Sequence, residues 1–281
     1  MKRFQTDEIH LRDPFILPTD GIYYLYGTRC GGAPGFDVYT GSDLLHWEGP
    51  YPVFTRPDGF WADQDFWAPE VHVYQGQYYM LASFKSPDRC RGTQILQADT
   101  PLGPFIPLTN GPVTPSHWEC LDGTLYVEGG TPYLVFCHEW LQVRDGEMCA
   151  MALTPDLYAP AGEPAVLFRA SEPAWAIRDA AYYVTDGPWL HRTKSGSLLM
   201  LWSSGTATGY SEAISRSLSG TLAGPWVHDP ALLITYGGGH GMTFRSFQNQ
   251  LLFLCHQPNR SPLERPKIFP LQETTNSLIR L

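Results

Sequence analysis

The sequence lacks the two apolar features that would direct a chain to a membrane. It has no run of about 18 apolar residues, which a membrane-spanning helix needs, and its first ten residues, Met1 to His10, have no apolar core like that of a secretion signal. We therefore expect neither a transmembrane helix nor a signal peptide, and the chain as given predicts a cytoplasmic protein.

Charged residues are also scarce, and those present are unbalanced. They make up 17% of the chain, and 19 basic against 28 acidic residues give a net charge of −9. A protein of this charge repels polyanions such as nucleic acids and anionic membranes. We expect no nucleic-acid partner, no membrane partner, and a neutral or cationic ligand.

The cysteines lack the C-x-x-C spacing that is typical of zinc and redox sites. Six are scattered through the chain: Cys30, Cys90, Cys120, Cys137, Cys149 and Cys255. In a chain of this size such scatter predicts free thiols rather than a disulfide framework.

Apolar and turn-forming residues are abundant. The 281 residues are 43% hydrophobic and 14% aromatic, and they include 27 glycines and 25 prolines. A chain of this length can bury a sizeable core. The composition indicates many short strands and turns rather than long helices.

Five segments of the chain repeat one pattern: a polar start, a short strand, a turn and a second, apolar strand. The equivalent points are Tyr24, Tyr79, Tyr133, Leu199 and Leu252. Their spacings of 55, 54, 66 and 53 residues are about one propeller blade each. The pattern predicts an all-β, five-bladed β-propeller in a single domain over residues 1–281, with blades starting near residues 13, 70, 122, 186 and 240. A protein of two β domains is the alternative.

Little sequence follows the fifth repeat, so the closure of the ring is left open. The segment Lys267–Leu271 can supply a third strand of the last blade. A fourth strand could come from Leu278–Leu281 or from the N-terminal segment, and either would cover the exposed sheet edge.

The innermost strand of each propeller blade begins near the central axis, so the residues at these starts should meet. They are Asp13, Glu70, Asp122, Asp186 and His240. Each alone is a common turn residue, but acids in four of five repeats indicate a site. Burial and like charge raise the pKa of crowded carboxyl groups, which suits acid and base chemistry. The returning strand of the third blade adds Glu139 to the candidate acids.

Five motifs carry a family resemblance. They are Arg12-Asp13-Pro14-Phe15-Ile16, Phe66-Trp67-Ala68-Pro69-Glu70-Val71, Leu121-Asp122-Gly123-Thr124, Thr185-Asp186-Gly187-Pro188 and Gly239-His240-Gly241-Met242. With these motifs the chain, from about Leu11 to Asn259, resembles glycoside hydrolase family 43, the five-bladed propeller arabinofuranosidases, arabinanases and xylosidases. The resemblance implies an oligosaccharide substrate and hydrolysis by three carboxyl groups, with inversion at the anomeric carbon of the sugar.

The same resemblance implies a role for each carboxyl group. By position, Asp13 is the general base that activates water, and Asp122 orients the general acid and tunes its pKa. The family's acid is a Glu in a Glu-Gly-Pro turn, where this chain has Asp186. The shorter side chain withdraws the carboxyl group by roughly 1.5 Å, and such a shift can cost about 10²-fold in rate. Either Asp186 is the acid in a repacked site, or Glu139 has taken the role, or the chain is weak or inactive as a hydrolase.

Other residues are candidates for binding substrate. Trp67 and Trp61 suit stacking on the C–H face of a sugar, although packing between blades is their alternative role. Glu70 is a candidate for binding sugar hydroxyls or orienting Lys85, and Arg245 for positioning a carboxylate. His240 is a further substrate candidate. The family often places such a His beside a metal ion or water cluster, so a central Ca²⁺ or Na⁺ is an optional occupant and no cofactor is required.

We expect an inverting, exo-acting glycoside hydrolase that removes terminal α-L-arabinofuranosyl, or β-D-xylosyl, residues from plant-type oligosaccharides. One rival is a retaining propeller glycosidase of the fructosidase type, whose Trp-Met-Asn-Asp-Pro start is absent here. The other is a non-catalytic carbohydrate-binding propeller, favoured by the missing Glu. The sequence does not predict an oligomeric state.

Overall fold

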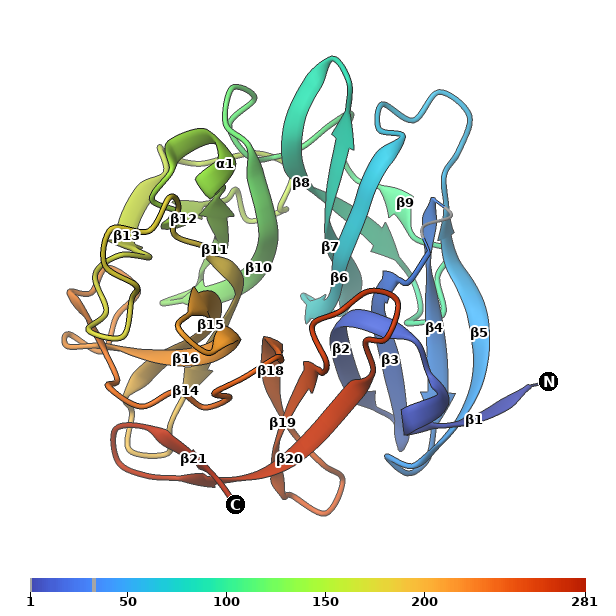
Figure 1. Ribbon diagram of the computed structural model, residues 1–281. Coiled ribbons are helices and arrows are strands. Elements are labelled where there is room, and N and C mark those ends of the chain that lie inside the picture. Colours follow the sequence, from blue (N-terminus) through green and yellow to red (C-terminus); the bar gives the residue numbers. More distant parts are fainter. Residues whose placement is uncertain (1, 32–33) are drawn as a thin grey trace.

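The chain folds into five antiparallel sheets arranged around a central axis (Figure 1). The computed structural model describes residues 2–31 and 34–281. Two short helical turns, η1 (Thr6–Glu8) and α1 (Trp140–Val143), are the helical elements of these residues, and no helix in them is long and apolar enough to cross a membrane. The prediction of a single-domain, all-β, five-bladed propeller is confirmed.

The first two blades contain nine strands. Blade 1 consists of β2 (Leu11–Thr19), β3 (Ile22–Arg29), β4 (Gly35–Gly41) and β5 (His46–Thr55), with β1 (Arg3–Gln5) paired outside β5. Blade 2 consists of β6 (Gln64–Tyr74), β7 (Gln77–Ser86), β8 (Arg89–Ala98) and β9 (Ile106–Pro107).

The other three blades have four strands each. Blade 3 consists of β10 (Cys120–Glu128), β11 (Thr131–His138), β12 (Glu147–Ala152) and β13 (Ala165–Arg169). Blade 4 consists of β14 (Asp186–Arg192), β15 (Leu198–Thr206), β16 (Gly209–Ser217) and β17 (Trp226–His228). Blade 5 consists of β18 (Gly239–Arg245), β19 (Leu251–His256), β20 (Pro266–Glu273) and β21 (Leu278–Arg280). The six cysteines are free, as predicted.

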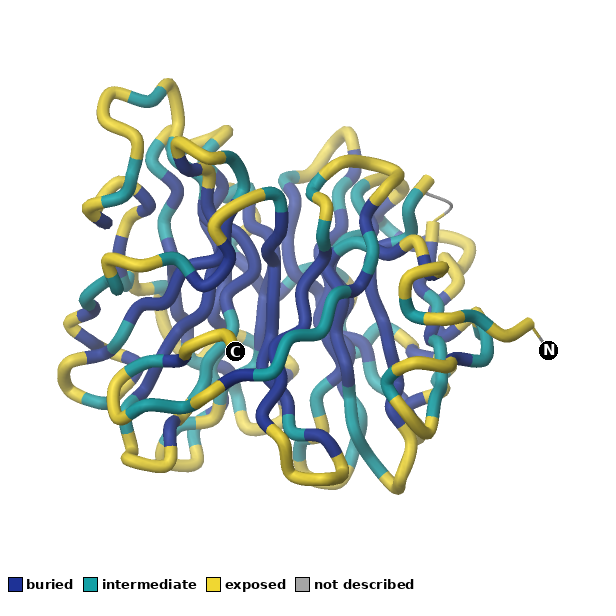
Figure 2. The backbone as a smooth tube through the Cα atoms, turned by 60° about the horizontal axis from the view of Figure 1, so that its bottom comes forward, coloured by how far each residue is buried: buried dark blue, intermediate teal, exposed yellow. Residues whose placement is uncertain are grey.

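The second strand of a blade is buried on both faces, as β15 shows. Leu198, Met200 and Trp202 belong to the apolar cluster between blades 3 and 4, whereas Leu199 and Leu201 belong to the cluster between blades 4 and 5. Successive side chains of a strand point to opposite faces. The continuous apolar run therefore fills two blade interfaces at once, and Figure 2 shows these buried central strands between exposed loops.

The ring closes without a shared sheet. The C-terminal strand β21 is the fourth strand of blade 5, and the N-terminal strand β1 stays on blade 1, so the first of the two closure alternatives is the one observed. Blades 1 and 5 meet where β2 packs against β18 and β19. A backbone hydrogen bond from the Leu11 N–H to the Glu264 oxygen also crosses this seam, at 3.3 Å.

Each innermost strand is interrupted by a two-residue bulge, and these bulges define the true equivalence of the blades. The bulged pairs are Asp13-Pro14, Ala68-Pro69, Asp122-Gly123, Gly187-Pro188 and His240-Gly241. The first residue of every pair is left-handed, with φ between 47° and 57°. The prediction that Glu70 and Asp186 are the equivalent residues of blades 2 and 4 is therefore wrong: Ala68 and Gly187 hold those places.

The second residue of every bulge is proline or glycine for a local reason. Proline has no N–H to leave unpaired when the ladder is interrupted. At Gly123 a Cβ would lie 2.5 Å from the Thr93 side chain, and at Gly241 it would lie 2.2 Å from the Phe253 ring. The bulges thus bring the five inner strands close together at the axis.

Candidate active site

The bulges tie neighbouring blades together and fix the side chains at the axis. In four blades the N–H of the first bulged residue donates to a side chain of the preceding blade: Asp13 to His256 (3.3 Å), Ala68 to Thr28 (2.7 Å), Asp122 to Ser83 (2.9 Å) and His240 to Ser203 (2.7 Å). The fifth N–H, of Gly187, donates to the Asp122 carboxyl group at 3.1 Å. The side chain at the corresponding place of blade 3 is Cys137, a weak acceptor, and the Asp122 carboxyl group replaces it.

A cavity of about 400 Å³ opens at the end of the axis where the inner strands begin. Its lining includes the buried Asp13, Asp122, Asp186 and His240 and the half-buried Arg12. The rest of its wall is formed by the buried Arg91, Leu121 and Glu139, the half-buried Trp67 and Trp140, and the exposed Leu141. The structure thus brings together six of the residues singled out in the sequence: Asp13, Trp67, Asp122, Glu139, Asp186 and His240.

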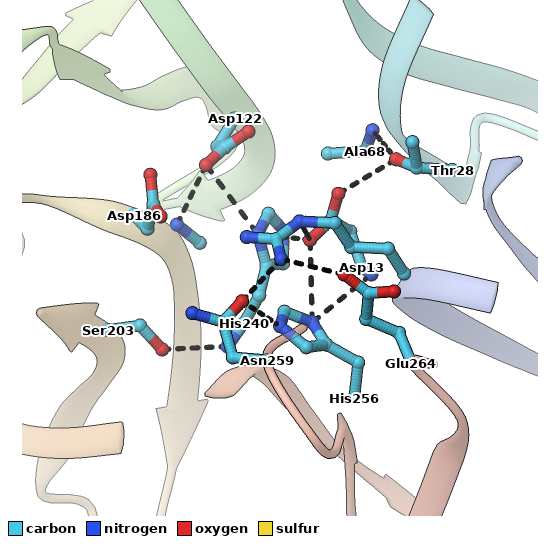
Figure 3. A network of polar contacts seen from close by, with 12 residues as sticks. Asp13, Thr28, Ala68, Asp122, Asp186, Ser203, His240, His256, Asn259 and Glu264 are labelled. Carbon is cyan, nitrogen blue, oxygen red and sulfur yellow. Dashed lines mark hydrogen bonds and ion pairs between the residues drawn. The ribbon is translucent and has the colours of Figure 1, made fainter. Parts of the chain in front are cut away.

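Asp13 is held by contacts to both of its oxygens, as Figure 3 shows. Oδ2 accepts a hydrogen bond from the Thr28 hydroxyl at 2.8 Å. Oδ1 is 3.3 Å from the Arg12 Nε and 3.3 Å from the His240 Nδ1 and accepts no hydrogen bond from the described residues. Burial acts to raise the pKa of Asp13, but His240 and Arg12 outweigh it and hold the pKa below its ordinary value. Asp13 is therefore ionised at neutral pH, and its Oδ1, although it accepts no hydrogen bond from the described residues, is a buried atom.

The pKa values of Asp122 and Asp186 are shifted in the opposite direction from that of Asp13. Burial, with the neighbouring charge of Asp13, raises the pKa of Asp122 to about 8. Burial, with Asp122 beside it, raises the pKa of Asp186 well above its usual range, although the Tyr210 hydroxyl donates to its Oδ2 at 2.9 Å. Both groups therefore lose their proton at a higher pH than an ordinary aspartate does. The site combines one carboxyl group that ionises readily with two that hold a proton more tightly, the combination that proton transfer in both directions needs.

Glu139 is buried in the cavity wall and forms an ion pair with Arg91. Its carboxyl group accepts a hydrogen bond from Arg91, whose Nη2 is 2.8 Å from Asp65 and whose guanidinium lies 4.4 Å from the Trp67 ring centroid. Burial raises the pKa of Glu139, and Arg91 opposes the rise. Asp186 and Glu139, the two candidate acids, thus both have a raised pKa, but only Glu139 is paired with a guanidinium.

Three predicted site residues lie elsewhere. Trp61 donates its indole N–H to Gln94 at 2.6 Å and packs against the core between blades 1 and 2. Arg245 lies at the opposite end of β18, with its Nη2 3.8 Å from Glu273. Glu70 is buried, is not among the residues that line the cavity, and contacts His72 at 2.8 Å, while Lys85 pairs with Glu119.

The sequence reasoning missed several residues of the site. Arg12 binds Asn259 and lies 3.4 Å from Glu264, both in the loop between β19 and β20. His256 donates from Nε2 to Asn259 at 3.2 Å and accepts the Asp13 N–H at Nδ1, which assigns its proton to Nε2. Arg12 had a local signal, since it precedes Asp13. His256 had one as well, because it ends the returning strand of the fifth blade, whereas Asn259 and Glu264 lie in a loop and had none.

The site does not resemble a cage for a metal ion. Across residues 2–31 and 34–281 no three His, Cys, Asp or Glu side chains are grouped as metal ligands. The Nδ1 of His240 instead lies 3.3 Å from Asp13 and 3.6 Å from Asp122. Ca²⁺ takes six to eight oxygen ligands, and this donor set does not supply them. A central ion at His240 stays a prediction from the resemblance, and no step proposed below uses one.

Glu212 is a further carboxyl group, fully buried behind the site on β16. Its Oε2 accepts a hydrogen bond from the Ser203 hydroxyl at 2.5 Å, and burial raises its pKa from 4.5 to about 8. Between these values the folded chain binds one proton more than the unfolded chain at this group. The free energy of unfolding therefore falls as pH rises through this interval.

We expect Glu212→Gln to weaken this pH dependence. Glutamine has no proton to lose, so the variant should lose less stability than the parent between pH 5 and pH 8, by about 3 kcal/mol. Urea denaturation at both pH values measures the difference. Glu163→Gln, at an exposed position, is the control and should leave the pH dependence unchanged. Equal losses in the parent and in Glu212→Gln would contradict the protonation assigned to Glu212.

The fold and the cluster together define a glycoside hydrolase of the propeller type, because cleavage of a glycosidic bond uses one carboxyl group as acid and one carboxylate as base or nucleophile. The family follows from comparison. The family model described as Glycosyl hydrolases family 43 matches residues 8–275, and the chain belongs to that family.

Known proteins similar to the chain include arabinan-degrading enzymes. An endo-arabinase from Bacteroides thetaiotaomicron VPI-5482 is 40% identical, with a TM-score of 0.89 over 96% of this chain and 97% of that one. An exo-1,5-alpha-L-arabinanase from a bovine ruminal metagenomic library has the same fold, with 17% identity and a TM-score of 0.75 over 99% of each chain. The extracellular endo-alpha-(1->5)-L-arabinanase 1 of Bacillus subtilis (strain 168) is 24% identical over 187 residues, which are 62% of this chain and 58% of that relative.

Proposed function

We propose that this protein hydrolyses α-L-arabinofuranosyl linkages with inversion of configuration. The observation that carries the proposal is that Asp13, whose pKa is lowered, and Asp186, whose pKa is raised, line one open cavity. The 40% identity to an endo-arabinase over almost the whole chain supports arabinan as the substrate class. Arg91 in the cavity wall is paired with Asp65 and Glu139, which favours a neutral sugar chain over an anionic one.

In the proposed mechanism the Asp13 carboxylate removes a proton from a water molecule. The water oxygen forms a bond to the anomeric carbon as the bond to the leaving-group oxygen breaks. Asp186 gives its proton to that leaving oxygen, and Asp122 supports Asp186 by accepting the N–H of Gly187. Glu139 is the alternative donor, and its pairing with Arg91 makes it second.

The substrate test compares arabinan, arabino-oligosaccharides and nitrophenyl α-L-arabinofuranoside with nitrophenyl β-D-xyloside. We expect hydrolysis of the arabinosides and slower hydrolysis of the xyloside. The exo mode predicts arabinose as the first product from arabinan. The name of the 40% identical relative favours an endo mode as the second candidate, for which oligosaccharides would appear first. Binding of arabino-oligosaccharides without any turnover would support the non-catalytic rival instead.

We expect the first product to have the anomeric configuration opposite to that of the substrate. An inverting enzyme places a water molecule between its base and the sugar, whereas a retaining one uses a nucleophile about 5–5.5 Å from the acid. Proton NMR during the first minutes of hydrolysis distinguishes the two anomers before they interconvert. Initial release of the retained anomer would assign the protein to the fructosidase-type mechanism.

A further inference from the structure

Tyr210 reaches the axis from the third strand of blade 4. It lies near the start of β16, and its hydroxyl donates a hydrogen bond to Oδ2 of Asp186 at 2.9 Å. Asp186 is buried at the start of β14, immediately before the bulged pair Gly187-Pro188. Tyr210 is half-buried and is not among the residues that line the cavity. Any effect of its hydroxyl on a reaction in the cavity must therefore pass through Asp186.

The ring of Tyr210 contacts the part of the site that holds Asp13. It stacks on the His256 ring, with the centroids 5.7 Å apart and the planes at 17°. His256 accepts the Asp13 N–H at 3.3 Å, and the Arg12 guanidinium lies 5.8 Å from the Tyr210 centroid. An inverting enzyme must keep its acid and its base far enough apart for a water molecule. Tyr210 contacts the proposed acid through its hydroxyl and the support of the proposed base through its ring.

One glycine makes room for this ring. A Cβ at Gly239 would lie 2.7 Å from the Tyr210 ring and 2.3 Å from the Ser203 Oγ. Ser203 cannot turn aside, because it accepts the His240 N–H at 2.7 Å and donates to Glu212 at 2.5 Å. The lack of a side chain at Gly239 therefore admits the Tyr210 ring to its place beside the axis.

The direction of the hydrogen bond decides which oxygen of Asp186 carries a proton. The Tyr210 hydroxyl is the donor and Oδ2 is the acceptor. In a protonated carboxyl group the carbonyl oxygen is the better acceptor, and the other oxygen is a donor. Donation to Oδ2 therefore favours the form of Asp186 whose proton is on Oδ1. Without this bond the carboxyl group could turn and present either oxygen to the substrate.

We propose that Tyr210 is a positioning residue, which keeps the Asp186 proton on Oδ1 and holds Asp186 in a fixed place relative to Asp13. The inference rests on the proposed function, because it takes Asp186 as the proton donor. It also supplies what a short donor needs: an aspartate has one methylene fewer than a glutamate with which to adjust its reach, and an outside contact fixes its orientation instead.

The kinetic test uses Tyr210→Phe, which removes the hydroxyl and keeps the stacked ring. We expect kcat on arabinobiose to fall about 10-fold, as for loss of one hydrogen bond, with KM unchanged. Nitrophenyl α-L-arabinofuranoside, whose leaving group needs little protonation, should be almost unaffected. The control is Tyr126→Phe, since that half-buried hydroxyl accepts from Arg192 at 2.7 Å near the far end of β10. It should behave as wild type. Equal losses on both substrates in Tyr210→Phe would mean a merely structural role and would overturn the inference.

A double-mutant cycle tests whether the effect passes through the acid. In an Asp186→Asn background, Tyr210→Phe should cause little further loss on arabinobiose, because residues that act as a unit are not additive. A second loss of about 10-fold in that background would show independent action. A steep leaving-group dependence confined to Glu139→Gln would make Glu139 the donor. Either result would overturn the inference and leave the proposed hydrolysis in place.

An infrared measurement without substrate separates the inference from the proposed function. The C=O stretch of a protonated carboxyl group rises in frequency when its carbonyl oxygen loses a hydrogen bond. At a pH below the pKa of Asp186, the band that disappears in Asp186→Asn should lie at higher frequency in Tyr210→Phe and stay in place in Tyr126→Phe. An unmoved band in Tyr210→Phe would overturn the inference. A moved band in a protein whose wild type hydrolyses no arabinoside would overturn the proposed function and retain Tyr210 as the residue that orients Asp186.

Discussion

Replacing Asp13 with asparagine should reduce kcat/KM on arabino-oligosaccharides by at least about 10³-fold, because general-base catalysis contributes about 10²- to 10⁴-fold. Asparagine has the same shape but cannot take a proton from water. It also tolerates the left-handed backbone of this position, where φ is 49°, so the bulge should persist. The melting temperature should stay close to that of the parent protein.

The matched control for this variant is Asp20→Asn. Asp20 is also left-handed, with φ of 51°, but it lies in the exposed turn at the other end of the same hairpin. Its replacement should change neither activity nor melting temperature. Turnover near the wild-type level in Asp13→Asn, with Asp20→Asn equally active, would exclude Asp13 as the base.

The second large effect concerns the proton donor. We expect Asp186→Asn to lower kcat on arabinobiose, a substrate with a poor leaving group, by about 10²- to 10⁴-fold. The same variant should lose no more than about tenfold on nitrophenyl α-L-arabinofuranoside, whose leaving group needs little protonation. The amide can still accept the hydrogen bond of Tyr210, so the loop should keep its place. Steady-state kinetics on the two substrates measure the contrast.

Glu139→Gln is the companion variant, because it tests the alternative donor in the same cavity. If Asp186 is the acid, Glu139→Gln should lower kcat on both substrates to a similar, modest extent, since Arg91 keeps its contact with Asp65. If the steep leaving-group dependence appears only in Glu139→Gln, then Glu139 donates the proton. Asp186 would in that case be a neighbouring carboxyl group without a donor role.

The repeat made the blades predictable from sequence, but distances along an inner strand misled the choice of site residues. Arg245 follows His240 by five residues, and a strand rises about 3.3 Å per residue, so Arg245 lies about 16 Å further along. Glu70 is two residues beyond the bulge at Ala68, and the interrupted ladder changes which side chains reach the axis. In the sequence, the only sign of each bulge is the Pro or Gly at its second position.

Contacts between distant segments could not be predicted at all. Arg91 reaches Glu139 from a different blade, and nothing near residue 91 in the sequence signals that contact. Asp13, Asp122 and Asp186 were predictable because each stands in a short motif beside a glycine or proline that the bulge requires.

The contacts that hold Asp13 and Arg12 in place also join blades 1 and 5 and so close the ring. Among the residues that the structure describes, no strand of one blade completes the sheet of the other, and the Asp13 N–H bond to His256 and the Arg12 contacts to Asn259 and Glu264 span this junction. Parting of the two blades would carry Asp13 away from Asp122 and Asp186 while every sheet remained intact. Catalysis would then stop before the β-sheet content changed, so loss of turnover would report on the opening of the ring earlier than any spectroscopic measure of unfolding.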